Sequence, residues 1–342
     1  MLENVPLAPY TTFKIGGPAR WFADVADEAE LLAAVAFARD RRLPLFALGG
    51  GSNLLVSDAG FSGVVARIVM KGVAASECGE EFRVAAGEDW DGFVRLAVEL
   101  NCAGVECLAG IPGTVGGTPV QNVGAYGQEV AETIQGVRAL DLRTREFVEM
   151  GREECGFSYR RSIFNTTEKG RYIVTRVDYK LRQGGAPSLA YADLQRRFAD
   201  AAAQPTLAEV CDAVRQIRRS KGMLMVQGEA DSRSAGSFFK NPVVPAADLA
   251  GIAVAAGLAE GAVPRYPAAH GRVKLPAAWL LEKAGFAKGT AQGRAGISSR
   301  HTLALVNLGG ATAADVIALR DHIVAVVEGK FGVRLEQEPV LL

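Results

Sequence analysis

Residues 108–127 read LAGIPGTVGGTPVQNVGAYG, and residues 48–56 read LGGGSNLLV at the end of the apolar segment PLFAL. Glycine permits positive φ angles and lets main-chain N–H groups approach a ligand with no Cβ in the way. Successive N–H groups in such turns form concavities that bind phosphate. We therefore predict that both loops bind a cofactor that carries a diphosphate, rather than serving only as tight turns between strands.

Two common nucleotide motifs are missing from these loops. No Gly-Lys-Ser/Thr follows either loop, as a P-loop requires, and the G-x-G-x-x-G order of a dinucleotide fingerprint is absent. The loops thus predict a different mode of cofactor binding.

Helices and strands alternate near the start, strands crowd the middle and both return at the end, which predicts an α+β fold. Capping signals and apolar spacing predict helices at 27–39, 206–220 and 312–328. Alternation and β-branched runs predict strands at 44–48, 63–70, 82–86, 136–141, 146–150, 172–181, 302–308 and 333–341. At 342 residues the chain is long enough for two or three domains. The polar segment 182–205, punctuated by Gly and Pro, is the candidate boundary.

Lys plus Arg and Asp plus Glu both total 38, so the formal net charge is zero. No global basic field is available for nucleic acid or an anionic membrane. We expect neither partner. The N-terminal segment does not resemble a signal peptide and no apolar run is long enough to span a bilayer, so we expect a cytoplasmic protein.

The chain has five cysteines, and none has a His or a second Cys at metal-binding spacing. We predict no metal site and interpret the cysteines as buried free thiols in a reducing compartment. The three histidines, His270, His301 and His322, all lie in the C-terminal half. We interpret all three as packing or solvent-facing residues.

Four motifs together resemble the UDP-N-acetylenolpyruvoylglucosamine reductase (MurB) family of peptidoglycan-precursor synthesis. They read TTFKIGGPAR (11–20), LGGGSNLLVSDAGFSGVV (48–65), LAGIPGTVGGTPVQNVGAYGQEV (108–130) and GSFFKNP (236–242). The resemblance covers essentially the whole chain and is closest to the longer, type I members.

The resemblance implies a fold in two parts. A FAD-binding domain of the vanillyl-alcohol-oxidase (PCMH) type would occupy residues 1–185, with two subdomains divided near residue 70. A C-terminal α+β substrate-binding domain would occupy 205–342. FAD would be bound non-covalently, NADPH would supply the hydride, and the acceptor would be UDP-N-acetylglucosamine enolpyruvate. We expect a monomer.

The two glycine loops supply the predicted FAD contacts. From the first loop these are Gly49, Gly50, Gly51, Ser52, Asn53 and Leu54. From the second they are Gly110, Ile111, Pro112, Gly113, Thr114, Gly116, Gly117, Gln121, Asn122, Gly124, Ala125 and Tyr126.

Hydride addition to an enolpyruvyl group leaves negative charge on the carbon beside the carboxylate, which then needs stabilisation and a general acid. By resemblance, Ser237 occupies the position of the proton donor, and Arg160 and Glu338 those of the residues that polarise the carboxylate. A guanidinium fork suits that carboxylate. The family usually has Pro before this Glu, whereas here Gln337 precedes it, so Glu336 is an open alternative.

Four further residues are predicted substrate contacts: Tyr191 and Lys221 match substrate-binding residues by resemblance, and Asn241 and Lys274 are further candidates to line the site. Each also has a structural interpretation, since Lys221 follows a helix C-terminus and Asn241 precedes a proline. The segment after Lys221, KGMLMVQGEADSRSAGS, is longer than the Lys-Leu-Pro-Asp-Pro run of many family members. That insertion leaves the distance from Lys221 to Ser237 open.

Two other functions compete with the reductase. One is a FAD-dependent alcohol or sugar oxidoreductase of the same fold, many of which bind flavin covalently through His. The absence of histidine near the glycine loops argues against this alternative. The other is a non-catalytic flavin-binding module, which would need the loops but not Ser237, Arg160 and Glu338 together.

Overall fold

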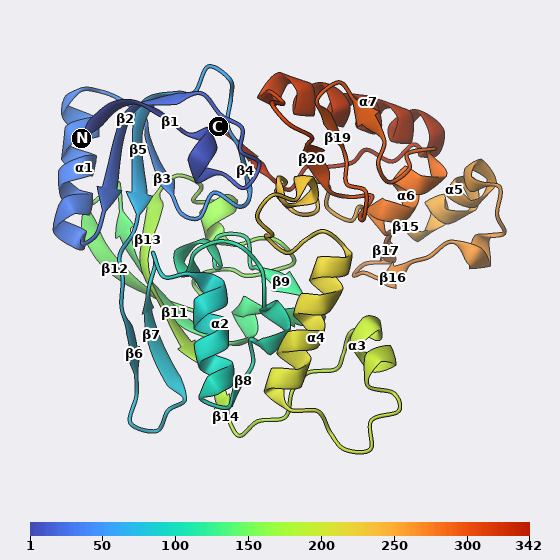
Figure 1. Cartoon of the computed structure of the whole chain (residues 1–342), viewed down its shortest axis with the longest axis horizontal. Coiled ribbons are helices and arrows are strands. Elements are labelled where there is room, and N and C mark those ends of the chain that lie inside the picture. The colour runs from blue at the N-terminus through green and yellow to red at the C-terminus, as the bar shows by residue number, and fades with distance from the viewer. The chain divides into compact units, whose positions relative to one another are not determined.

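The computed structural model describes all 342 residues, which form two compact units (Figure 1). The first unit contains Met1–Val5, Ala19–Gly51 and Phe61–Ser220. The second contains Pro6–Pro18, Ser52–Gly60 and Lys221–Leu342. The whole of the predicted boundary segment, 182–205, thus lies in the first unit. The functional domain limits of 1–185 and 205–342 stay a prediction.

One sheet of the first unit has the order β1 (Leu2–Pro6), β2 (Pro18–Val25), β5 (Phe61–Ile68), β3 (Leu45–Leu48). The central strand β5 is parallel to both β2 and β3. Helix α1 (Glu28–Asp40) packs against β5. It begins where the Asp27 carboxylate accepts the Glu30 N–H at 2.8 Å, as the capping signal predicts.

The larger sheet of the first unit is antiparallel, with the order β12 (Glu146–Gly151), β11 (Ile134–Asp141), β13 (Tyr172–Lys180), β7 (Glu81–Ala85), β6 (Val73–Ala75). Val177 lies opposite Val137 on one side and Val84 on the other, and all three are fully buried. This apolar row forms the core face of the sheet. The strands predicted near these positions are confirmed.

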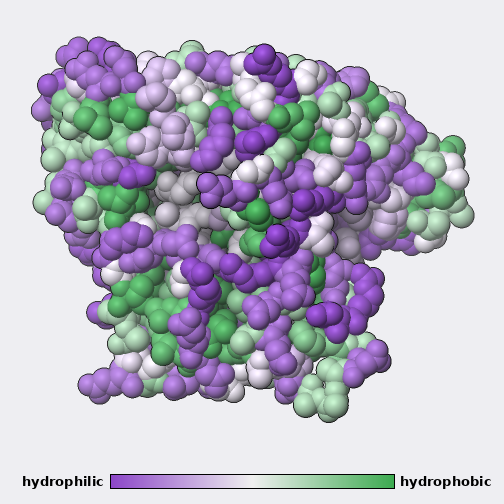
Figure 2. All heavy atoms as spheres, in the orientation of Figure 1, coloured by the Kyte–Doolittle hydropathy of each residue, from purple (hydrophilic) through white to green (hydrophobic).

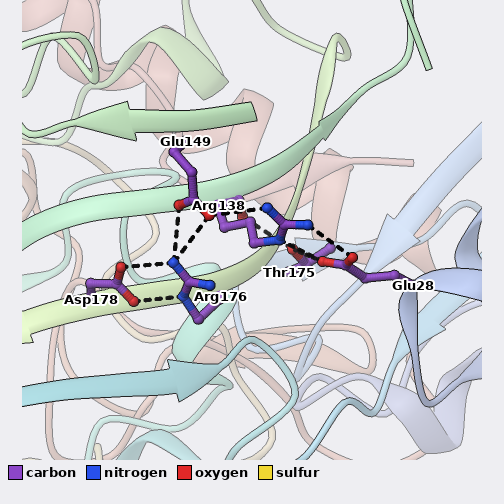
Figure 3. Close-up of polar contacts among 6 residues, drawn as sticks. All are labelled: Glu28, Arg138, Glu149, Thr175, Arg176 and Asp178. Atoms are coloured by element: carbon purple, nitrogen blue, oxygen red, sulfur yellow. Dashed lines mark hydrogen bonds and ion pairs between the residues drawn. The ribbon is translucent and has the colours of Figure 1, made fainter. Parts of the chain in front are cut away.

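An ion-pair network joins this sheet to α1 (Figure 3). Arg138 donates to Glu28 of α1 at 2.7 Å and to Glu149 at 3.0 Å. Arg176 lies directly opposite Arg138 and pairs with Glu149 at 3.0 Å and Asp178 at 2.7 Å. Like charges opposite one another destabilise a sheet, so the carboxylates offset the repulsion of the two guanidiniums. The hydrogen bond from Arg138 lowers the pKa of Glu28.

Helices α2 (Trp90–Glu99) and α4 (Leu207–Ser220) pack against one another, and α3 (Ala192–Arg197) contacts α4 (Figure 1). The predicted capping box of α4 is present, with Thr206 and Glu209 exchanging hydrogen bonds at 2.7 and 3.2 Å. Helices α2 and α3 are additions to the predicted set. The remaining strands of this unit are short: β8 (Cys102–Ala103), β9 (Gly124–Ala125), β10 (Gln128–Glu129) and β14 (Arg182–Gln183).

The second unit contains three small sheets. They are β15 (Val243–Pro245), β17 (Arg272–Lys274), β16 (Tyr266–Pro267); β18 (Ala291–Gln292), β19 (Ala295–Ile297), β20 (Leu305–Asn307); and β21 (Val340–Leu341) with β4 (Leu54–Leu55). Its helices are α5 (Leu249–Ala256), α6 (Ala277–Lys283) and α7 (Ala313–Phe331). The predicted strand at 302–308 shortens to β20.

Helix α7 is capped twice at its start. Thr312 and Asp315 form the predicted capping box, and the Asp58 carboxylate accepts the N–H groups of Ala313 and Ala314 at 2.7 and 3.0 Å. The prediction of a strand over 333–341 is wrong for residues 333–339. There only Gln337 pairs, as an isolated bridge to Phe239, before the short β21 begins. Pro339 has no N–H with which to extend the ladder.

On the face drawn in Figure 2, hydrophilic and hydrophobic residues are interspersed. None of the helices combines the length and the apolarity needed to span a bilayer. The prediction that the cysteines are buried holds for Cys102, Cys107, Cys155 and Cys211, but it is wrong for Cys78, which is exposed. Cys78 lies in the polar turn between β6 and β7, where no core is available to cover it.

Candidate functional site

Residues Gly49–Gly51 of the first glycine loop meet the second glycine loop within the first unit. A Cβ on Gly49 would lie 2.7 Å from Thr114 Oγ1, and one on Gly50 would lie 2.6 Å from Gly113 Cα. Gly113 itself has a φ of 136°, a backbone angle that residues with a Cβ rarely adopt. The contact between the loops therefore requires glycine on both sides.

The contact leaves backbone donors available. The loops are fixed by other groups: Val115 N–H donates to Glu88 O at 2.9 Å and Gly116 N–H to Ala86 O at 2.8 Å. The N–H groups of Gly50, Gly51, Ile111 and Thr114 donate to no main-chain carbonyl. Backbone N–H groups in turns of this kind suit an anionic diphosphate, so the residues present fit the predicted cofactor.

An ion pair between Asp91 and Arg215 holds the start of the second loop. The Asp91 carboxylate accepts the Gly110 N–H at 2.6 Å and pairs with Arg215 of α4 at 2.5 Å. Burial opposes ionisation of Asp91, but the hydrogen bonds from Arg215 and Gly110 outweigh it and lower the pKa of that carboxyl group. Helices α2 and α4 thereby hold the start of the loop in place.

Arg218 of α4 contacts the carbonyl oxygen of the same glycine. Arg218 is only 5% exposed, and its guanidinium donates to Gly110 O at 3.0 Å. Burial lowers the pKa of Arg218. The sequence prediction did not include Asp91, Arg215 or Arg218, because the periodicity of a helix does not show which polar residue turns inward.

Asn122 and Leu54 are placed differently from the glycines among the predicted FAD contacts. The Asn122 amide donates to Glu129 at 2.7 Å and to Ser158 O at 3.0 Å, and it accepts the Ala131 N–H at 3.1 Å. Its side chain therefore stabilises the loop itself. Leu54 is buried in β4, paired with Val340.

Arg160 lies against the end of the second loop. Its guanidinium donates to Gly124 O at 2.6 Å, and a Cβ on Gly124 would lie 3.1 Å from Arg160 Nη1. Nearby, the rings of Tyr126 and Tyr191 meet edge to face at 5.2 Å between centroids. Within the first unit, then, a predicted catalytic residue and a predicted substrate contact gather at predicted FAD-binding residues.

Ser237 and Glu338 lie on neighbouring segments of the second unit. Phe239 and Gln337 form an antiparallel bridge, and Glu338 N–H donates to Phe238 O at 2.8 Å. Asn53 donates from its side chain to Glu338 O at 3.3 Å. Segments 101 residues apart along the chain, from 237 to 338, are thereby brought side by side.

The structure separates the two candidate carboxylates. The side chain of Glu336 is 78% exposed and pairs with Lys240 at 3.6 Å. Glu338 is partly buried and flanked by the buried Pro339. This environment favours Glu338 as the catalytic carboxylate, because an exposed ion pair is screened by water.

Two of the predicted substrate contacts of the second unit, Asn241 and Lys274, lie on neighbouring segments, because Val243 pairs with Lys274 and Leu275 N–H donates to Pro242 O at 2.9 Å. Lys221 follows α4, outside the helix. Asn241 accepts the Ala277 N–H at 2.9 Å through its side-chain oxygen, which stabilises the start of α6. Lys274 ends β17, with its ammonium 5.7 Å from the centre of the Tyr266 ring.

The sequence interpretation gave His301 no role beyond packing or facing solvent, but the structure places it beside Ser237. Its Nε2 lies 3.4 Å from Ser237 Oγ. Burial, followed by the charges of Lys221 and Lys288, lowers the pKa of His301 to about 4. No motif in the surrounding SSRHT sequence signals this contact, because the two residues are 64 positions apart.

Two family models match the chain. One, described as an FAD binding domain, matches residues 19–151, and the other, the C-terminal domain of UDP-N-acetylenolpyruvoylglucosamine reductase, matches 228–342. A reductase of that name from Thermobifida fusca is 46% identical over 348 residues, which cover 99% of this chain and 97% of the relative. The chain belongs to the UDP-N-acetylenolpyruvoylglucosamine reductase family.

Other members of this reductase family agree. The reductase from Streptomyces coelicolor is 46% identical over 345 residues, covering 99% of this chain and 89% of the relative. The crystal structure of the reductase from Thermus caldophilus matches with a TM-score of 0.67 and 28% identity, over 100% of this chain and 98% of that one. The predicted family, the α+β fold class and the FAD cofactor are confirmed; the individual site residues stay predictions.

Proposed function

We propose that the chain reduces the enolpyruvyl group of UDP-N-acetylglucosamine enolpyruvate to give UDP-N-acetylmuramate, with NADPH as the hydride source. The observation that carries the proposal is the match to the reductase family along the whole chain, which includes both domains. The meeting of the two glycine loops supports it, because it provides the backbone donors that a diphosphate cofactor needs.

FAD, when bound, would carry a hydride from NADPH to the enolpyruvyl group. The loop N–H groups of Gly50, Gly51, Ile111 and Thr114 would hold the cofactor diphosphate. Asp91, Arg215 and Arg218 hold Gly110 at the start of the second loop, which would orient the donors of that loop before the cofactor binds.

Three residues would handle the charge that appears on the substrate. Arg160 would bind the substrate carboxylate through its guanidinium fork, and Glu338 would help to polarise it. Ser237 would then donate its hydroxyl proton to the carbon beside the carboxylate. Lys221, Tyr191, Asn241 and Lys274 would contact the rest of the substrate. Residues 1–185 would form the FAD-binding domain, which also supplies Arg160, and residues 205–342 the substrate-binding domain. A monomeric state and a cytoplasmic location stay predictions.

The test begins with the purified chain. It should be yellow, and denaturation with acid should release all of its flavin into the supernatant, because no covalent link is expected. NADPH consumption should depend on the enolpyruvyl substrate. Flavin that stays with the precipitate would instead support an oxidase with covalently bound flavin. NADPH consumption that does not depend on the enolpyruvyl substrate would contradict the proposed reduction.

A further inference from the structure

The contact between His301 and Ser237 is fixed by main-chain pairing. Phe238 N–H donates to Leu303 O at 2.8 Å, and Ser234 forms an antiparallel bridge with Val306. The segment that carries Ser237 therefore runs along the segment that follows His301. The distance of 3.4 Å between Ser237 Oγ and His301 Nε2 is set by this register.

The turn that carries His301 is held by a second set of contacts. Ser298 Oγ accepts the N–H groups of Arg300 and His301 at 3.1 and 3.2 Å. Asp231 accepts Ser299 N–H at 3.0 Å and Ser299 Oγ at 2.7 Å, and it pairs with Arg300 at 3.4 Å. Asp231 belongs to the inserted segment after Lys221. The insertion thus helps to hold the turn that carries His301.

The imidazole is neutral at pH 7. Burial is the largest cause, the ammonium groups of Lys221 and Lys288 oppose protonation, and Glu282 only partly compensates. A neutral imidazole carries one N–H, which either nitrogen can hold. A serine hydroxyl has one proton to donate and two lone pairs that can accept.

We propose that His301 is a positioning residue for Ser237, donating its Nε2–H to Ser237 Oγ so that the serine proton is directed to the substrate carbon. The inference rests on the proposed reduction and on Ser237 as its proton donor. In the opposite arrangement, Ser237 Oγ–H would donate to Nε2, and its proton would point at the imidazole instead of the substrate carbon.

The proton transfer gives the same contact a second role. The Oγ–H bond of Ser237 breaks, the enolate electron pair forms the new C–H bond, and Oγ keeps its own pair as an alkoxide. The Nε2–H of His301 then makes a charge-assisted hydrogen bond to that alkoxide, which is stronger than a neutral one. A proton from water restores the hydroxyl before the next turnover.

The test uses the FAD-loaded enzyme with NADPH and the enolpyruvyl substrate in separate stopped-flow half-reactions. His301→Ala should leave flavin reduction by NADPH near the parent rate and slow flavin reoxidation by about 10- to 100-fold, as expected for one hydrogen bond to a charged group. His301→Gln, whose side-chain amide retains an N–H donor, should recover part of that loss. The exposed His270 provides the control, and His270→Asn should change neither half-reaction.

A double-mutant cycle separates positioning from a structural role. If His301 acts through Ser237, the variant carrying Ser237→Ala and His301→Ala should reoxidise no more slowly than Ser237→Ala alone. Reoxidation in the parent should also show no titration of His301 at pH values above its pKa of about 4.

Three outcomes would overturn the proposal. The double variant would reoxidise more slowly than Ser237→Ala by the full factor seen for His301→Ala, or His301→Ala would slow both half-reactions equally, or His301→Gln would recover none of the lost rate. A Ser237→Ala enzyme that reoxidises at the parent rate would refute the proton donor itself. A parent enzyme that the substrate fails to reoxidise would refute the proposed function instead.

Discussion

The glycine loops of the first unit and the Ser237 region of the second unit are built on opposite principles. In the loops, the groups offered to a ligand belong to the backbone, and a polar side chain such as Asn122 is used to stabilise the loop itself. Around Ser237, the backbone is used for pairing, and the groups that remain for chemistry are side chains.

This difference explains why one region is easier to recognise than the other. A glycine that is needed for a close approach leaves a mark at its own position in the sequence. A hydroxyl whose contact is an imidazole 64 residues away leaves none. Binding by backbone is therefore visible locally, whereas side-chain chemistry depends on the fold.

The largest expected effect tests the side-chain region. Ser237→Ala should fold, bind FAD and be reduced by NADPH at close to the parent rate, because only the second hydride transfer requires protonation of carbon. Flavin reoxidation by the substrate should slow by about 10²–10⁴-fold, the usual loss for a general acid. Stopped-flow absorbance of the flavin measures each half separately, and Ser237→Cys should recover part of the rate. Equal slowing of both halves would make Ser237 a structural residue.

Lys221 tests whether the insertion changes the role of a side chain. If Lys221 binds the substrate diphosphate, Lys221→Ala should weaken substrate binding by roughly 1.5–3 kcal/mol, typical of one charge-assisted contact. Titration of the oxidised holoenzyme with substrate measures this. Unchanged affinity would assign Lys221 to the helix terminus.

Gly50 tests the backbone region. Gly50→Ala places a Cβ 2.6 Å from Gly113 Cα, so the two loops must separate. Overpacking of this kind typically costs about 1–3 kcal/mol, and we expect it as a loss of FAD affinity. The ratio of flavin to protein after dialysis is the measurement. Gly329→Ala on α7, where an added Cβ meets nothing within 4 Å, should retain its flavin. Full flavin content in Gly50→Ala would contradict the requirement for glycine.

Asp91 is a side chain that stabilises a site made of backbone groups, because its carboxylate accepts the Gly110 N–H. Asp91→Asn should lower the free energy of unfolding at pH 7 by about 1–2 kcal/mol, since the ion pair with Arg215 is partly solvent-screened. The folded-state pKa of Asp91 lies below its ordinary value of 3.8, so the unfolded chain binds the proton first. The stability that Asp91 contributes is complete above that value and is lost as the pH falls through the folded-state pKa.

The difference between Asp91→Asn and the parent should therefore shrink below about pH 4. Denaturant titrations at several pH values check this. A difference that is constant with pH would show that the carboxylate is not ionised preferentially in the folded state.

The smallest effect is expected in the ion-pair network of Figure 3, which belongs to neither the glycine loops nor the Ser237 region. Arg138→Met should cost about 0.5–1 kcal/mol of stability and less at high salt, because its partners Glu28 and Glu149 are partly exposed. Flavin content and both half-reactions should be unchanged. Loss of flavin in this variant would show that the network shapes the cofactor loops.

The elements that were predicted, among them helices α1, α4 and α7, were accessible from sequence because their signals are local, whereas α2, α3, α5, α6 and many short strands were not predicted. The capping pairs Thr206–Glu209 and Thr312–Asp315 marked the starts of α4 and α7, and alternation marked the strands of the large sheet. The segment 333–339 misled the prediction, since β-branched and apolar residues there pack without forming a ladder. Ladders need a partner strand, and its position is not encoded in the segment itself.

By itself, the sequence determined the family, the α+β fold and the two glycine loops, since each depends on residues adjacent along the chain. Only the tertiary structure decided which side chains complete the sites. It placed Arg160 at Gly124, Asp91 and Arg218 at Gly110, and His301 at Ser237. The physical reason is range: conformational preference acts over a few residues, whereas hydrogen bonds and burial act over a few ångströms, whatever the separation along the chain.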